Sequence, residues 1–135
     1  MKTNILFLCK YNRFRSRIAE DYFNKINKNP LVKAKSAGII KGSPIDKLEQ
    51  KVCKEMKIDI SGKTQGISTK LLKWQNLIVI VANDVQVELF NDNKKYSKKT
   101  IVWKIPDNKT DKVSEIKGIV NKIKRNVDKL IKELN

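Results

Sequence analysis

Near its amino terminus the chain reads Ile5-Leu6-Phe7-Leu8-Cys9-Lys10-Tyr11-Asn12-Arg13-Phe14-Arg15-Ser16. The first four of these residues form a short apolar run, and an amphipathic stretch begins just after Ser16. This order predicts a strand, a tight loop and the start of a helix. A loop that enters a helix in this way directs successive backbone N–H groups and the positive end of the helix dipole at one point. We therefore expect an anion site here, with the Cys9 thiol at its rim.

The spacing of Cys9 and Arg15 also has a trivial explanation. With four Arg and two Cys in 135 residues, some Cys is followed by an Arg six places later in roughly one such chain of seventeen by chance. The preceding strand, the following helix, Asn12 inside the loop and the hydroxyl of Ser16 make the coincidence much rarer. The pattern therefore favours a site that handles phosphate or a similar oxyanion.

The motif and three later segments together resemble the low-molecular-weight protein tyrosine phosphatases and the related thioredoxin-coupled arsenate reductases. The segments of resemblance are Cys-x5-Arg-Ser with Asn12 and Ala19-Glu20, then Ser36-Ala37-Gly38, then Lys57-Ile58-Asp59-Ile60-Ser61, and finally Ile105-Pro106-Asp107. They occur in the family's order over the whole chain. The resemblance implies a phosphomonoester hydrolase, expected to be a protein tyrosine phosphatase that forms a phosphocysteine intermediate.

Alternating strand and helix patterns predict an α/β fold, a single three-layer domain over residues 1–135 with a four-stranded parallel sheet flanked by helices on both faces. We expect strands at about residues 3–8, 32–37, 76–82 and 100–105 and helices at about 14–28, 44–57, 68–74 and 111–134. Ser43-Pro44-Ile45-Asp46 is expected to start the second helix, with Ser43 as its N-cap. Asn83 or Asp84 is expected to cap a further short helix that reaches Phe90. The resemblance implies the strand order 2-1-3-4.

The net charge of +16 raises the question of nucleic-acid binding, but the basic residues are mostly Lys spread along every segment. Three of the four Arg residues lie in or beside the Cys9 loop, and no nucleic-acid-binding motif is present. No apolar run is long enough to span a membrane, and the start lacks the pattern of a secretory signal. We therefore expect a cytoplasmic protein, a monomer, with no specific nucleic acid and no membrane as partner.

The chain contains no His, which excludes Ser-His-Asp and Cys-His catalytic pairs and any His-based zinc site. We expect no metal and no cofactor. Cys53 shares one helical face with Ile45, Leu48, Val52 and Met56, so it is interpreted as a buried apolar residue. A redox partnership of Cys53 with Cys9 is the alternative.

Each residue of the Cys9 loop can be given a role. The seven residues Lys10, Tyr11, Asn12, Arg13, Phe14, Arg15 and Ser16 are expected to bind phosphate, mostly through backbone N–H groups. Cys9 is the expected nucleophile as its thiolate, and the planar guanidinium of Arg15 suits two phosphoryl oxygens. Ser16 can donate its hydroxyl to the Cys9 sulfur, or it can simply be a serine at a helix start.

Asn12 tolerates positive φ, and the resemblance implies that it ties the loop to Ser36. Asp107 is the expected general acid and base, because a departing phenolate needs a proton. Asp84, Asp92 and Asp111 are rejected for this role because they lack the strand-end setting or look like caps and loop residues. Without the resemblance, Pro106-Asp107-Asn108 would also be an ordinary turn.

The chain departs from the family pattern at several positions. Tyr11 stands where the family has a loop Gly, so the backbone there either avoids positive φ or is strained. Asn108-Lys109-Thr110 replaces the residues that flank a phosphotyrosine ring, which weakens a preference for phosphotyrosine. Phosphorylated proteins or small phosphomonoesters are the expected substrates, and phosphate, sulfate or vanadate the expected ligands. The alternatives are an arsenate reductase and a phosphate- or phosphoprotein-binding module without turnover.

Overall fold

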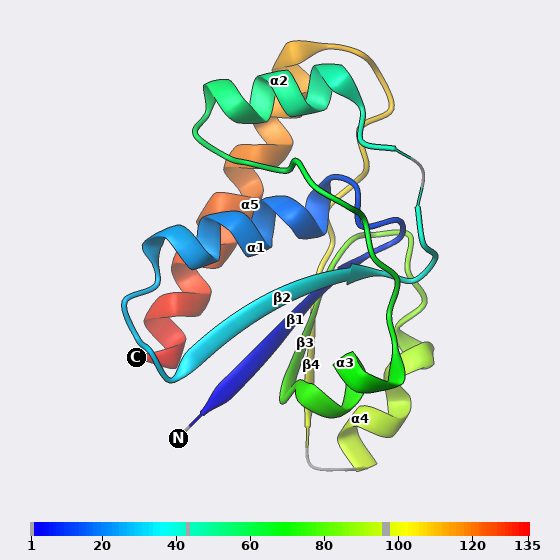
Figure 1. The fold of residues 1–135 in the computed structure, drawn as a ribbon, viewed down its shortest axis with the longest axis vertical. Helices are drawn as coiled ribbons and strands as arrows, with labels where there is room; N and C mark the ends of the chain where they lie inside the picture. Colours follow the sequence, from blue (N-terminus) through cyan, green and yellow to red (C-terminus); the bar gives the residue numbers. More distant parts are fainter. Residues whose placement is uncertain (1, 43, 96–97) are drawn as a thin grey trace.

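Four parallel strands form the centre of the protein in a computed structural model that describes residues 2–42, 44–95 and 98–135. They are β1 (Thr3–Cys9), β2 (Val32–Gly38), β3 (Leu77–Val81) and β4 (Lys99–Trp103). Their order in the sheet is β2-β1-β3-β4, with every neighbouring pair parallel (Figure 1). This confirms the expected fold class and strand order.

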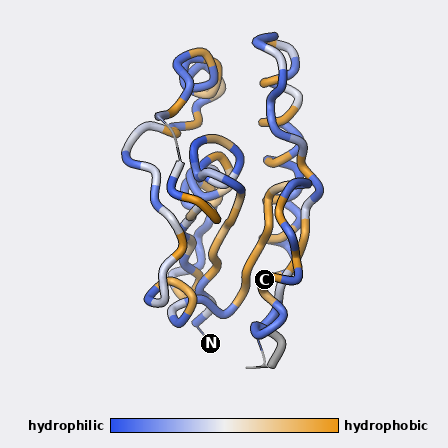
Figure 2. Tube along the Cα trace, turned by 90° about the vertical axis from the view of Figure 1, so that its right-hand side faces the viewer, coloured by the Kyte–Doolittle hydropathy of each residue, from blue (hydrophilic) through white to orange (hydrophobic). Residues whose placement is uncertain are grey.

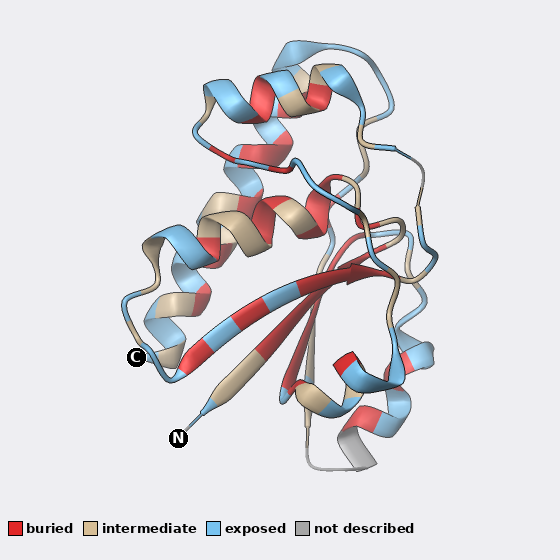
Figure 3. Ribbon diagram, viewed as in Figure 1, coloured by how far each residue is buried: buried red, intermediate tan, exposed pale blue. Residues whose placement is uncertain are grey.

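The two central strands are apolar because both faces of the sheet are covered. Residues 5–9 of β1 and all of β3 are buried, whereas β2 alternates buried and exposed positions along its first half (Figure 3). Along the chain trace, the hydrophobic colour gathers in these strands and in the helix faces turned toward them (Figure 2). The sheet therefore divides the core into two apolar clusters.

Helices cover each face of the sheet, as expected for a three-layer α/β domain (Figure 1). One face is covered by α1 (Arg15–Ile26) and α5 (Val113–Leu134), and α2 (Lys47–Glu55) packs against α5. The other face is covered by α3 (Thr69–Trp74), the 3₁₀ turn η1 (Val87–Phe90) and α4 (Asn91–Lys95). The long α5 presents an apolar stripe, spaced by three and four residues, to the core.

Two helix starts differ from the sequence prediction. Helix α2 begins at Lys47 rather than near residue 44, because the Asp46 carboxylate caps it by accepting a hydrogen bond from Glu49 N at 2.9 Å. The expected cap, Ser43, lies outside the described residues. The short helix after β3 begins at Val87, so Asn83 and Asp84 do not cap it, and α4 was not predicted.

The remaining boundaries differ by a few residues. Helix α1 ends at Ile26 rather than 28, and β4 runs from residue 99 to 103 rather than from 100 to 105. Within the described residues, none of the helices combines the length and the apolar composition that a membrane span requires. The carboxyl ends of β1, β3 and β4 meet at one edge of the sheet, which is where ligands bind in parallel α/β folds.

Candidate active site

Cys9 is the last residue of β1 and lies against the first turn of α1. Its Sγ atom is 3.0 Å from Ser16 Oγ, and the two side chains are buried. The thiol therefore faces the helix start that the sequence analysis expected. A hydroxyl at this distance can donate a hydrogen bond to sulfur, which stabilises a thiolate.

Asn12 is the residue that shapes the loop between β1 and α1. Its φ of 55° lies in the left-handed region, which Asn adopts more readily than most residues. The buried side chain donates to Ser16 Oγ at 2.9 Å and to Ser36 Oγ at 3.0 Å, and it accepts from Gln65 N at 2.9 Å. The expected tie between Asn12 and Ser36 is therefore present.

The polar network continues from Ser36 to residues that the sequence analysis did not place in it. Ser36 Oγ donates to Glu20 Oε1 at 2.6 Å, and Gln65 Nε2 donates to Ser36 O at 2.7 Å. Burial raises the pKa of Glu20 above its usual value, although the Ser36 hydrogen bond and Arg17 oppose that shift. The position of Glu20, four residues after Ser16 on α1, was the available signal.

The backbone N–H groups of the loop have no hydrogen-bond acceptor among the described residues. These are the N–H groups of residues 10–16, and no side chain in the described part of the chain caps α1. Buried backbone donors require an acceptor, and an oxyanion at the start of α1 would provide one. These unpaired donors lie where the sequence analysis predicted the anion site.

Tyr11 replaces the family's loop Gly without positive φ, so the first of the two expectations for this position is correct. Its ring has Lys10 Nζ and the Arg13 guanidinium each 5.4 Å from the centroid. The end of β2 packs against Tyr11 so closely that a Cβ at Gly38 would lie 2.6 Å from the Tyr11 carbonyl carbon. The backbone at Tyr11 is therefore held in place by a neighbouring strand.

Arg15 is almost fully buried, at 2% exposure, and reaches the loops that follow β3 and β4. Its Nη1 donates to Ile105 O at 3.0 Å and lies 3.0 Å from Asp84 Oδ1. Its Nη2 lies 3.3 Å from Asp84 Oδ2 and 3.8 Å from Asp107 Oδ2. A single guanidinium therefore links the β1–α1 loop to both acidic loops.

The structure corrects the sequence analysis on Asp84, which was interpreted as a helix cap or loop residue and not as a partner of Arg15. Asp84 instead forms the shortest ion pair of Arg15, and its side chain is 37% exposed. It follows β3, the neighbour of β1, and the carboxyl ends of adjacent parallel strands lie together. That strand-end position was the signal that could have identified it.

Asp107 lies beyond β4 at the same edge of the sheet, as expected, with 22% of its side chain exposed. Its Oδ1 accepts a hydrogen bond from Asn108 N at 2.9 Å, and Asn108 Nδ2 donates to Glu49 Oε2 at 3.1 Å. Burial is the main cause that raises the pKa of Glu49 to about 7. The sequence analysis missed Glu49, which belongs to α2 rather than to a strand end.

Arg17 organises the chain segment beside the site. Its guanidinium donates to Ile60 O at 2.8 Å, to Lys63 O at 2.9 Å and to Ser61 O. Gly62, with φ of 107°, turns the chain around this side chain. Arg17 thus has a structural role, because it holds residues 60–63 beside the start of α1.

Cys53 is buried in the core cluster on the α1 and α5 face, whereas Cys9 belongs to the cluster on the opposite face. Burial raises the pKa of the Cys53 thiol to about 12, so it remains protonated. Both cysteines are free. Within residues 2–42, 44–95 and 98–135, no three His, Cys, Asp or Glu side chains gather as a metal site.

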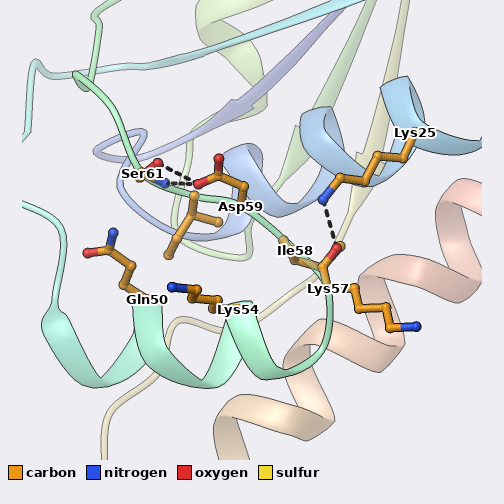
Figure 4. Close-up of a pocket in the computed structure, with 8 residues that line it drawn as sticks. Lys25, Gln50, Lys54, Lys57, Ile58, Asp59 and Ser61 are labelled. Carbon is orange, nitrogen blue, oxygen red and sulfur yellow. Dashed lines mark hydrogen bonds between the residues drawn. The ribbon is translucent and has the colours of Figure 1, made fainter.

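A separate cavity of about 340 Å³ lies between α1, α2 and residues 57–61 (Figure 4). Its polar groups are largely bonded to the protein: Lys25 pairs with Asp21 at 2.8 Å and donates to Lys57 O at 2.8 Å, and Asp59 accepts from Ser61. None of its lining residues belongs to the Cys9 loop. This cavity is therefore not the anion site.

Residues 4–135 match the family model of the low molecular weight phosphotyrosine protein phosphatases. The chain belongs to this family, and its fold and family support a phosphatase. The search against curated protein sequences found no significant match.

Three solved structures illustrate the likeness. A low molecular weight protein tyrosine phosphatase from T. tengcongensis is 26% identical, with a TM-score of 0.82 over 98% of this chain and 99% of its own. An arsenate reductase from Archaeoglobus fulgidus is 25% identical, with a TM-score of 0.75 over 94% and 98%. The YwlE arginine phosphatase from Geobacillus stearothermophilus is 22% identical, with a TM-score of 0.81 over 98% and 92%.

Proposed function

We propose that this protein hydrolyses phosphomonoesters, with phosphotyrosine proteins as the principal substrate class, through a phosphocysteine on Cys9. The observation that carries the proposal is the 3.0 Å contact of Cys9 Sγ with Ser16 Oγ beneath a loop of free N–H donors. A thiolate there is stabilised by the helix start, and the same donors bind the phosphoryl oxygens. Membership of the phosphatase family supports the same reaction.

In the first step, the Cys9 thiolate attacks phosphorus and the bond to the leaving oxygen breaks. Protonated Asp107 gives its proton to that oxygen, so a phenol departs rather than a phenolate. Arg15 and the loop N–H groups bind the equatorial oxygens throughout. In the second step, ionised Asp107 takes a proton from water, the water oxygen bonds to phosphorus, and Cys9 leaves as a thiolate that accepts from Ser16.

The arsenate reductase alternative is less well supported, because reduction through successive disulfides needs a second accessible thiol. Cys53 is the only other cysteine, and it is buried on the opposite side of the sheet from Cys9. The binding-module alternative would apply if Tyr11 blocked the in-line path to Cys9 or if Asp107 were misplaced. The distance of 3.8 Å between Asp107 Oδ2 and Arg15 Nη2 supports an acid at the site and so argues against the second condition.

Turnover of p-nitrophenyl phosphate by the purified chain tests the proposal. Cys9→Ser is expected to abolish hydrolysis. Asp107→Asn is expected to lower kcat/KM by about 10²- to 10⁴-fold for phenyl phosphate, which has a poor leaving group, and by less for p-nitrophenyl phosphate. Asp111→Asn, an exposed acid near the same loop, is the matched control and should retain full activity. Vanadate binding without any hydrolysis would instead favour the binding module.

The substrate class requires a second comparison. Three peptides of otherwise equal sequence carry phosphotyrosine, phosphoserine or phosphoarginine at one position. The phosphotyrosine peptide should be hydrolysed fastest. Faster hydrolysis of phosphoarginine would contradict the substrate class but not the phosphocysteine reaction. Arsenate reduction coupled to thioredoxin, without phosphatase activity, would contradict both. We also propose a cytoplasmic location and a monomer, as the sequence analysis expected.

A further inference from the structure

Glu49 is a buried carboxyl group that the proposed reaction does not use. It belongs to α2 and is 5% exposed, yet its Oε2 accepts a hydrogen bond from Asn108 Nδ2 at 3.1 Å. The backbone N–H of the same asparagine donates to Asp107 Oδ1 at 2.9 Å. Asn108 therefore connects the carboxyl group of Asp107 to the side of α2.

The side-chain oxygen of Asn108 indicates independently which protonation state of Glu49 suits the contact between these two residues. Asn108 Oδ1 is buried and, among the described residues, receives no hydrogen bond. An ionised carboxylate only accepts hydrogen bonds, whereas a protonated carboxyl group can both accept one and donate one. The neutral form of Glu49 therefore offers the donor that a buried amide oxygen needs, and the ionised form does not.

The surroundings of Glu49 favour that neutral form. Burial, followed by the nearby carboxylates of Asp46 and Asp107, raises its pKa to about 7, while the Asn108 hydrogen bond and Arg13 act in the opposite direction. These groups come from the start of α2, the loop after β4 and the loop after β1. Glu49 therefore changes charge within the neutral pH range.

We propose that Glu49 is a positioning residue for the general acid, because through Asn108 it holds the loop of Asp107 over the Cys9 site, and holds it best as the neutral acid. This inference rests on the proposed function. Asn108, through which Glu49 would act, lies at a position where this chain departs from the family pattern. Glu49 does not contact the reacting atoms and is not itself catalytic.

The expected consequence depends on the leaving group. A poor leaving group such as phenol needs a correctly placed proton donor, whereas p-nitrophenol needs it much less. Glu49→Ala should therefore lower kcat/KM for phenyl phosphate by about 10- to 100-fold, and by less than about threefold for p-nitrophenyl phosphate. A merely structural role would lower both rates equally.

Glu49→Gln provides the conservative comparison, because an amide can accept from Asn108 Nδ2 and donate to Asn108 Oδ1 at every pH. This variant should retain most activity toward phenyl phosphate. The ratio of wild-type to Glu49→Gln kcat/KM should fall as the pH rises through about 7, where wild-type Glu49 ionises. Glu55→Gln removes an exposed carboxyl group from the same helix and should leave the pH profile unchanged.

Asn108→Ala tests the same link from the other side, and it remains informative if Glu49→Ala fails to fold. It should reproduce the selective loss on phenyl phosphate, and the double variant should lose no more than the larger single loss. Additive losses, equal losses on both substrates or an unchanged pH ratio would each overturn the inference. An inactive wild-type protein would instead overturn the proposed function on which the inference depends.

Discussion

Arg15 Nη1 lies 3.0 Å from Asp84 Oδ1, and the second oxygen of the same carboxylate lies 3.3 Å from Nη2. Asp84 thus holds the end of the guanidinium that also bonds Ile105 O. Among the described residues, no hydrogen bond uses Arg15 Nε. The Nε–H group is therefore available to donate to a phosphoryl oxygen.

Asp84→Ala should therefore weaken both the fold and the site. Arg15 is buried, and removing the closest partner of a buried charge is destabilising. Because Asp84 is 37% exposed, we expect the free energy of unfolding to fall by only about 1–2 kcal/mol. Urea denaturation measures this change, and kcat/KM should fall by about tenfold as Arg15 loses its fixed orientation. Asp92→Ala, an exposed acid in the following segment, is the control; equal behaviour of the two variants would contradict this role for Asp84.

Ser16→Ala should reduce the reactivity of Cys9 without unfolding the loop. The substitution removes the hydroxyl 3.0 Å from Cys9 Sγ but keeps the start of α1. We expect alkylation of Cys9 by iodoacetamide at pH 7 to slow by about tenfold, since the sulfur loses a hydrogen bond from the Ser16 hydroxyl. Ser114→Ala, at an exposed position of α5, should leave the rate unchanged. An unaltered alkylation rate in Ser16→Ala would show that the hydroxyl does not act on the sulfur.

Asn12 combines positive φ with a side-chain network, and two substitutions separate these contributions. Asn12→Gly keeps access to the left-handed region but loses the hydrogen bonds to Ser16, Ser36 and Gln65, whereas Asn12→Ala loses both. We expect both variants to be less stable than wild type, with the Ala variant lower by about 1 kcal/mol than the Gly variant. Thermal unfolding measures the difference. A Gly variant no more stable than the Ala variant would show that φ at this position carries no cost.

Glu49 should make the stability of the fold depend on pH. Its pKa is raised from 4.5 to about 7 in the folded protein, so between these values the folded state binds a proton that the unfolded state has lost. The stabilisation is complete below about pH 4.5 and is lost as the pH rises through about 7. The gain in unfolding free energy from Glu49→Gln should therefore be larger at pH 8 than at pH 5, by on the order of 2 kcal/mol. Urea titrations at both pH values check this, and an equal gain at both would contradict the raised pKa.

The sequence predicted the parts of the structure that depend on local pattern. Hydrophobic periodicity predicted β1 from the apolar run before Cys9, and it predicted α5 from its apolar stripe. Capping residues predicted the start of α2 to within a few residues. The order of the strands in the sheet cannot be predicted from hydrophobic periodicity, and it was implied by the resemblance instead. Cys9, Asn12 and Ser16 were placed together because they lie in or beside one loop, whereas the tie to Ser36 followed from the resemblance.

The residues that were missed or rejected are joined to the site only by tertiary packing. Asp84 meets Arg15 because β3 lies beside β1, and Glu49 meets Asn108 because α2 packs near the loop after β4. In sequence, Asp84 looked like a helix cap and Glu49 like a polar position on an amphipathic helix. No local pattern marks either contact, since each depends on how separate segments lie in the folded chain.

The most direct test is to identify the covalent intermediate. The protein is mixed with p-nitrophenyl phosphate, quenched in acid during turnover, digested and analysed by mass spectrometry for a phosphoryl group on the peptide that contains Cys9. We predict phosphate on Cys9 in the wild-type protein and its absence in Cys9→Ser. Steady hydrolysis with no phosphate on Cys9, or with phosphate on another residue, would contradict the account.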